Sequence, residues 1–236
     1  MEDFSDYIKA LLNKENVRKL TIEQLDTEAS VYGRLTKTGG HAFSSNVRSR
    51  SAGIAVTFGG DNVATKNPNA QQQGIIDDLD DTLESLKKYL DRAPLISVQR
   101  TIGDNEDFNA KCTLIVSEQR KDNLRQAHLW THTLREYSQN AKGPELFVLS
   151  VPEWPENEKQ VLCFPDQGLT VILGIDYVGE VKMGFLRMAM WEAKQEGMLS
   201  LHAGSKILMA NRPDGSTGKQ GMLLFGLSGT GKTTHS

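Results

Sequence analysis

The chain has 236 residues, of which 38% are hydrophobic and 24% are charged, an ordinary composition for a soluble globular protein of one large domain or two small ones. Its formal net charge of -3 excludes a general attraction to nucleic acid or to an anionic membrane, so any anion site must be local. Cys112 and Cys163 are the only cysteines and lack metal-ligand spacing, which favours two core thiols in a reducing cytoplasm over a disulfide framework. No stretch resembles a leader or reaches the roughly 18 apolar residues of a membrane span, so we expect a cytoplasmic protein without a membrane partner.

Hydrophobic periodicity predicts a mixture of helices and short strands along the chain. In chain order, the pattern predicts an amphipathic helix and a second short helix from Thr21 within residues 1–30, a strand at 53–58, a helix at 75–90, strands at 95–100 and 112–116, a helix at 123–134, and strands at 146–150, 161–164, 168–174 and 221–225. Because the strands outnumber the helices, we expect an α/β or α+β domain before the last strand.

Two polar segments separate the first of these elements. Residues 31–56 are rich in Gly, Ser, Thr and basic residues, and we expect a loop that brings Arg34, Arg48 and Arg50 beside the following strand. Each arginine taken alone is more often a solvated surface residue. Residues 59–74 have no periodic apolar pattern, so we expect a surface connection without chemistry there.

His128 and His132 have i, i+4 spacing within the predicted helix at 123–134, which puts both imidazoles on one face within reach of a metal. No glutamate lies between them in the zinc-protease pattern, and Trp130 and Leu134 indicate a helix packed for structural reasons. We therefore favour a structural role for the two histidines.

The segment after the last predicted strand contains the complete phosphate-binding pattern G-x-x-x-x-G-K-[ST]. Its residues are Gly226, Leu227, Ser228, Gly229, Thr230, Gly231, Lys232, Thr233 and Thr234. In such a loop the backbone N–H groups face a polyphosphate, Lys232 reaches the β- and γ-phosphates, and the Thr233 hydroxyl faces magnesium. A glycine-rich turn that carries Lys-Thr by chance is the alternative, but the strand at 221–225 precedes the loop as the motif requires. The pattern predicts nucleotide binding.

Two further segments make the pattern more specific. Residues 177–184 read Tyr-Val-Gly-Glu-Val-Lys-Met-Gly, and residues 200–202 read Ser-Leu-His. Followed by a strand and Gly-Leu-Ser-Gly-Thr-Gly-Lys-Thr-Thr, they resemble the ATP-dependent phosphoenolpyruvate carboxykinases, whose first segment is Tyr-x-Gly-Glu-x-Lys-Lys-Gly. The phosphate loop agrees with the family at every position, including Leu227 and Ser228. Upstream, Arg48-Ser49 stands where the family has Gly-Arg-Ser-Pro-Lys-Asp-Lys.

The resemblance implies an α/β fold, with a carboxykinase-like N-terminal domain built on a mixed sheet over residues 1–205 and the beginning of a P-loop nucleotide-binding domain over residues 206–236. It implies conversion of oxaloacetate and ATP to phosphoenolpyruvate, carbon dioxide and ADP, with ATP, magnesium and manganese as cofactors. The implied partners are these small-molecule substrates, without nucleic acid, and the oligomeric state stays open.

The resemblance also implies a role for individual residues. Arg48 would bind the substrate carboxylate and Tyr177 would lie beside the substrate. His202 would bind manganese, and Thr233 would bind magnesium. The other catalytic residues that it implies are Lys182 and Lys232.

Two positions depart from the family pattern. The Pro-Lys-Asp-Lys continuation is replaced by residues 50–53, which leaves Arg34 and Arg50 as alternatives to Arg48. Met183 replaces the second lysine, and a thioether is a poor ligand for a hard ion. If the segment is extended, Lys182 faces away from the space that Met183 occupies.

Met183 leaves two alternatives to a carboxykinase, namely a kinase or phosphotransferase that has lost the oxaloacetate site, and a non-catalytic regulatory domain. The family's acidic metal ligands and adenine pocket are expected after Ser236. We therefore expect this fragment alone to bind ATP weakly and to be inactive.

Overall fold

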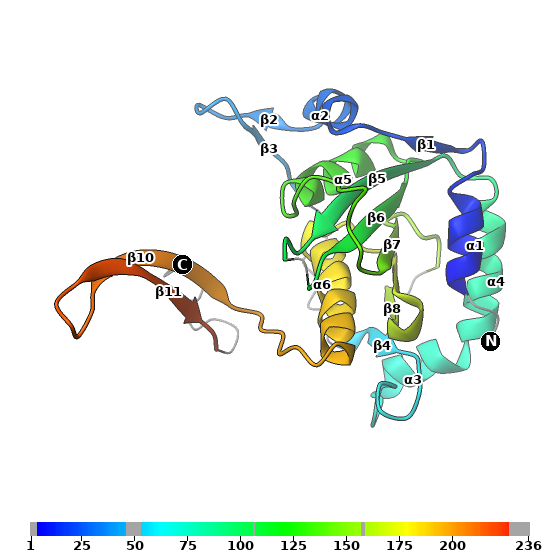
Figure 1. Ribbon diagram of the computed structural model, residues 1–236. Coiled ribbons are helices and arrows are strands. Elements are labelled where there is room, and N and C mark those ends of the chain that lie inside the picture. The colour runs from blue at the N-terminus through cyan, green and yellow to red at the C-terminus, as the bar shows by residue number, and fades with distance from the viewer. Residues whose placement is uncertain (1–3, 46–52, 106, 157–158, 227–236) are drawn as a thin grey trace. The chain divides into compact units, whose positions relative to one another are not determined.

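The computed structural model describes residues 4–45, 53–105, 107–156 and 159–226 (Figure 1). The chain divides into two compact units, Met1–Glu192 and Ala193–Ser236. Within the described residues, the larger unit is built on a seven-stranded mixed sheet and the smaller on a two-stranded hairpin. None of the helices in these ranges is both long enough and apolar enough to cross a membrane.

The elements follow one another in this order. The larger unit contains α1 (Phe4–Leu11), β1 (Val17–Lys19), α2 (Ile22–Ser30), β2 (Arg34–Leu35), β3 (His41–Ala42), β4 (Ala55–Thr57), α3 (Ala70–Asp77), α4 (Leu79–Leu90), β5 (Leu95–Ile102), β6 (Ala110–Ser117), the 3₁₀ helix η2 (Lys121–Asn123), α5 (Leu124–Thr131), β7 (Glu145–Val151), β8 (Gln160–Phe164), the 3₁₀ helix η3 (Pro165–Gln167) and β9 (Leu169–Leu173). Helix α6 (Val178–Gln195) begins in the larger unit, and the smaller unit contains β10 (Gly204–Asn211) and β11 (Thr217–Leu224).

The large sheet has the strand order β1-β5-β6-β7-β9-β8-β4. Strand β5 is antiparallel to β6, and β8 is antiparallel to β9, whereas the other neighbours are parallel. In the centre, Cys112 of β6 pairs with Leu146 of β7, and Val148 of β7 pairs with Thr170 of β9. The carboxyl ends of β6, β7 and β9 therefore lie at the same edge of the sheet.

Helices cover both faces of this sheet, and the alternation of side chains along β7 separates two cores. Phe147 and Leu149 pack into the core beneath α1, α3 and α4, whereas Leu146 and Val148 pack into the core beneath α2, α5 and α6. Figure 1 shows α1 and α4 side by side, on the opposite side of the sheet from α6. Because both faces are covered, the central strands are almost continuously apolar.

Most predicted elements are present, including the helix after Thr21. The Thr21 side chain accepts a hydrogen bond from the Gln24 backbone N–H, and the Gln24 side chain accepts one from the Thr21 N–H. This capping box fixes the start of α2. The mixed sheet and the strand before the phosphate loop are also confirmed, the latter as β11, which pairs antiparallel with β10.

The structure differs from the sequence expectations in three places. The helix predicted at 75–90 is divided between α3 and α4, which are separated at Asp78. The unpatterned connection at 59–74 ends in helix α3, because Asn69 and Gln72 form a second capping box that starts this helix. The segment 177–185 is not extended, since α6 begins at Val178 and packs an apolar face on the sheet. The short strands β1, β2 and β3 and the eight-residue strand β10 had not been predicted.

Candidate active site

Tyr177 lies in the connection between β9 and α6. Strand β9 is buried along its length, Gly174 turns the chain with a φ of 71°, and the Tyr177 side chain emerges with 40% of its surface exposed. Because β9 runs parallel to β7, Tyr177 stands at the carboxyl ends of parallel strands. Ligands of open α/β sheets bind at this edge.

Helix α5 fixes the backbone just before Tyr177. Arg125 donates to Asp176 at 2.5 Å, and both side chains are only 10% exposed. The neighbouring Gln126 donates to the Ile175 carbonyl at 3.3 Å and accepts from the Ser150 hydroxyl at 2.7 Å. A buried ion pair and a buried amide thus tie the connection to α5 and β7.

A cleft of about 220 Å³ opens beside Tyr177. Its walls come from the segment after β3, from α5 and from the start of α6. The lining residues are Phe43, Ser44, Ser45, Arg125, Gln126, Leu129, Asp176, Tyr177 and Val178. This volume is below the range of about 300–1,000 Å³ that suits drug-sized ligands, so the cleft suits a smaller polar molecule.

The glycines of the segment Tyr-Val-Gly-Glu-Val-Lys-Met-Gly are required by close contacts. A Cβ at Gly179 would lie 2.4 Å from a ring carbon of Tyr177, so glycine leaves room for the ring. A Cβ at Gly184 would lie 3.0 Å from Val148 and 3.3 Å from Thr170, so glycine lets α6 approach the sheet closely. The motif therefore contains positions for packing as well as positions for chemistry.

The remaining polar residues of this segment differ in their surroundings. Glu180 is buried and forms an ion pair with Arg187, which also donates to the Met183 carbonyl at 3.2 Å. Lys182 is exposed and Met183 is half-buried. On a helix of 3.6 residues per turn, neighbours are about 100° apart, so Lys182 and Met183 do not point in opposite directions. This corrects the orientation expected for an extended segment.

The other predicted site residues fall into two groups. His202 is exposed in the segment before β10, and Gly226 is exposed just after β11, both in the smaller unit. The following positions lie outside the described residues: Arg48, Leu227, Ser228, Gly229, Thr230, Gly231, Lys232, Thr233 and Thr234.

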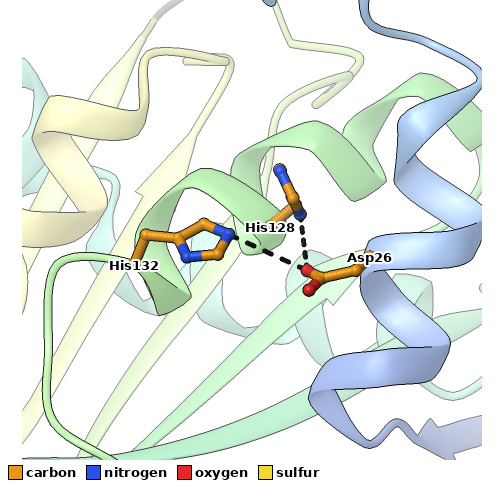
Figure 2. A group of neighbouring side chains, drawn as sticks. All are labelled: Asp26, His128 and His132. Atoms are coloured by element: carbon orange, nitrogen blue, oxygen red, sulfur yellow. Dashed lines mark hydrogen bonds and ion pairs between the residues drawn. The ribbon is translucent and has the colours of Figure 1, made fainter. Parts of the chain in front are cut away.

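Apart from the cleft, a cluster of polar side chains lies where α2 packs against α5. Figure 2 shows His128 and His132 of the α5 region directed toward Asp26 of α2. His128 Nδ1 is 2.8 Å from Asp26 Oδ1, and His132 Nε2 is 3.8 Å from the same oxygen. Burial lowers the pKa of His128 below its usual value of 6.5, although Asp26 opposes this effect.

Sequence reasoning missed Arg125, Asp176 and Asp26. Asp26 and His128 are separated by 102 positions, so no local pattern connects them. Arg125 and Asp176 are 51 positions apart, and each resembles an ordinary surface charge in the sequence.

Comparison with known proteins places these features in a family. A sequence model described as phosphoenolpyruvate carboxykinase matches residues 11–236. The phosphoenolpyruvate carboxykinase (ATP) of Aeropyrum pernix is 43% identical over 91 residues, which are 38% of this chain and 18% of that protein. The protein of the same name from Sinorhizobium medicae is 29% identical over 147 residues, which are 59% of this chain and 26% of that protein. The one from Dictyostelium discoideum is 46% identical over 66 residues, which are 28% of this chain and 10% of that protein.

The chain therefore spans only a small part of each of these relatives, at most 26% in the matches given above. The family match, in contrast, extends over nearly the whole chain. It includes the Tyr177 segment, the Ser-Leu-His segment and the phosphate loop. The chain belongs to the ATP-dependent phosphoenolpyruvate carboxykinase family.

Proposed function

We propose that this protein converts oxaloacetate and ATP to phosphoenolpyruvate, carbon dioxide and ADP. The observation that carries the proposal is the family match over residues 11–236, which contains the complete phosphate-loop pattern. The matched relatives are named phosphoenolpyruvate carboxykinase (ATP). The same match favours this activity over the phosphotransferase and regulatory alternatives that Met183 raised.

The cleft beside Tyr177 is the proposed site for the four-carbon substrate. Its volume of about 220 Å³ suits a small dicarboxylate, and Tyr177 can donate its hydroxyl proton to a substrate oxygen. The wall at Ser44 and Ser45 leads along the chain to Arg48, the proposed carboxylate ligand. Arg125 is already paired with Asp122 and Asp176. We therefore propose that Arg48, rather than Arg125, binds the substrate carboxylate.

The phosphate loop is the proposed ATP site. In the reaction, the bond between C3 of oxaloacetate and its carboxylate breaks, and the electron pair left behind forms an enolate. The enolate oxygen then attacks the γ-phosphorus, and ADP leaves. Lys232 and the loop N–H groups would stabilise charge on the phosphates, and Lys182 would stabilise charge on the enolate.

Magnesium and manganese are the proposed metal cofactors, and they would offset negative charge on the phosphates and the enolate. Thr233 is the proposed magnesium ligand and His202 the proposed manganese ligand. The donor set fits manganese only in part, because His202 supplies an imidazole whereas Met183 supplies a thioether.

The cytoplasmic location and the domain division at residues 205 and 206 are further proposals. The division of the chain into compact units falls between Glu192 and Ala193.

The activity is tested on purified full-length protein by measuring ATP consumption with and without oxaloacetate, and by measuring phosphoenolpyruvate directly. We expect consumption of ATP that depends on oxaloacetate, with one phosphoenolpyruvate formed for each ATP consumed. ATP hydrolysis independent of oxaloacetate would contradict the proposal and favour the phosphotransferase alternative.

The role of the cleft is tested with Tyr177→Phe in the same assay. Tyr32→Phe is a matched control, because both tyrosines are 40% exposed and Tyr32 is not among the residues that line the cleft. We expect Tyr177→Phe to raise KM for oxaloacetate while KM for ATP stays unchanged, and Tyr32→Phe to change neither. Equal effects of the two substitutions would exclude the cleft as the substrate site.

A further inference from the structure

We propose that Asp26, His128 and His132 bind a divalent transition-metal ion such as Zn²⁺. This inference does not depend on the proposed carboxykinase activity, because none of the three residues belongs to the cleft or to the phosphate loop. One candidate ligand comes from α2 and two come from the α5 region, with the histidines at i, i+4 spacing on one face (Figure 2). Helices α2 and α5 pack directly against each other, so the three side chains are held together by the fold.

The distances between the candidate ligand atoms fit a zinc-sized ion after small side-chain movements. One ligand atom from each residue lies within 4.8 Å of the other two. Asp26 Oδ1 is 2.8 Å from His128 Nδ1 and 3.8 Å from His132 Nε2. Tetrahedral zinc with bonds of 2.0–2.1 Å places its ligand atoms about 3.4 Å apart, between these two values.

The exposure of the three side chains fits the entry of an ion from solvent. His128 is 14% exposed and is held by Asp26 and by the Phe43 ring, whose centroid is 5.1 Å from that of the imidazole. His132 is 57% exposed and Asp26 is 42% exposed, so both can rotate toward an ion that His128 has bound. Two imidazoles and one carboxylate leave a fourth position for water.

The donor set decides the class of metal. Imidazole suits zinc, copper, nickel and iron, whereas magnesium and calcium prefer oxygen ligands alone. Two imidazoles and one carboxylate are also the protein ligands of known zinc sites. This separates the proposed site from the magnesium and manganese sites of the carboxykinase reaction, which are assigned to Thr233 and His202.

A bound ion would connect three parts of the larger unit. It would join α2 to α5, and through His128 it would stabilise the packing of Phe43. Phe43 also lines the cleft beside Tyr177. We therefore expect zinc to raise the melting temperature, because an ion that binds only the folded state stabilises that state.

The experiment is a calorimetric titration of metal-free full-length protein with Zn²⁺ and, separately, with Mg²⁺. The variants are His132→Ala and Asp26→Asn, and both alter partly exposed side chains, so the fold is expected to persist; circular dichroism checks this. Loss of an outer-shell partner alone weakens metal binding about 10–100-fold. Loss of a ligand should therefore weaken zinc binding at least about 10-fold. A second readout is Co²⁺ in place of Zn²⁺, whose visible absorption should change in both variants.

Two controls distinguish this site from others. Glu23→Gln removes an exposed carboxylate of α2 outside the cluster and should leave zinc affinity unchanged. His202→Ala removes the proposed manganese ligand and should leave the binding measured here intact. The proposal is overturned if His132→Ala and Asp26→Asn bind zinc as tightly as the wild type, or if His202→Ala abolishes the binding.

Discussion

Gly179 and Gly184 show how the same residue type serves two purposes within one short motif. At Gly179 the absent Cβ makes space for the ring of Tyr177, a residue proposed to contact substrate. At Gly184 it makes space for Val148 and Thr170, which belong to the sheet beneath α6. The two positions therefore predict different consequences of substitution.

Gly179→Ala should weaken substrate binding without destabilising the fold. The new Cβ would lie 2.4 Å from the Tyr177 ring, and the ring is free to turn away because it is partly exposed. Gly179 is the second residue of α6, and alanine is a better helix former than glycine, so thermal stability should stay unchanged or rise. Measurement of KM for oxaloacetate, with thermal unfolding alongside, checks both parts.

Gly184→Val is the contrasting substitution. Its side chain would press on Val148 and Thr170 inside the core, and overpacking of this kind costs about 1–3 kcal/mol. We expect a lower free energy of unfolding in urea. Wild-type stability would show that α6 can move away from the sheet at no cost.

Met183→Lys tests the residue at which this chain departs from its family. If the protein is a carboxykinase, the added amine restores a metal ligand, so manganese binding should tighten, and His202→Ala should weaken it. Manganese titration followed by paramagnetic relaxation of water protons measures both effects. Unchanged manganese affinity in His202→Ala would remove His202 from the proposed metal site.

At the scale of elements, Arg18 connects β1, α2 and the end of β6. Its guanidinium donates to Glu28 of α2 at 2.7 Å and to Glu118, just after β6, at 2.7 Å. Glu118 is nearly inaccessible to solvent, and it also forms an ion pair with Lys121. Removal of a partner from a buried carboxylate leaves its charge less well compensated, and this destabilises the folded state.

Arg18→Met should therefore lower the free energy of unfolding by about 1–3 kcal/mol. Lys9→Met is the matched control, because it removes the Lys9–Asp6 pair on α1, whose side chains are both largely exposed. Such surface pairs contribute about 0–1 kcal/mol. Urea denaturation of the two variants should separate the buried pair from the exposed one, and equal losses would contradict this account.

The same network predicts a pH dependence of stability. The Arg18 guanidinium lowers the pKa of Glu28 below its usual value of 4.5. A carboxyl group with a lowered pKa stabilises the folded state above its usual pKa, and this stabilisation is lost as the pH falls through the folded-state pKa. Between pH 6 and pH 3, wild-type protein should lose more stability than Arg18→Met. Parallel losses in urea titrations across this range would show that Glu28 contributes nothing.

At the scale of the whole molecule, the large sheet should unfold as a unit. Cys112 of β6 and Cys163 of β8 are both buried, and burial raises the pKa of Cys112 to about 12 and also raises that of Cys163. Thiolates are the reactive species, so neither thiol should react with a disulfide reagent in the folded protein. Both should react together as urea opens the sheet. Labelling of one cysteine well before the other would indicate that β8 opens independently of β6.

The sequence by itself determined the local elements and the family. Helical periodicity, alternating apolar residues and the Thr21 capping box depend on neighbours a few positions apart, so they can be read without the fold. The phosphate-loop pattern, the Tyr177 segment and the Ser-Leu-His segment are likewise contiguous, and together they indicate the family. The assigned roles of Arg48, Lys232 and Thr233 stay predictions.

Only the tertiary structure decided how distant segments meet. Strand β4 pairs with β8 about a hundred positions later, and β5 and β6 lie between β1 and β7. Residues 178–185 are helical because packing of one apolar face on the sheet stabilises a helix. Asp26 joins His128 and His132 because α2 packs on α5. These outcomes depend on burial between segments far apart in the chain, which a local sequence pattern does not encode.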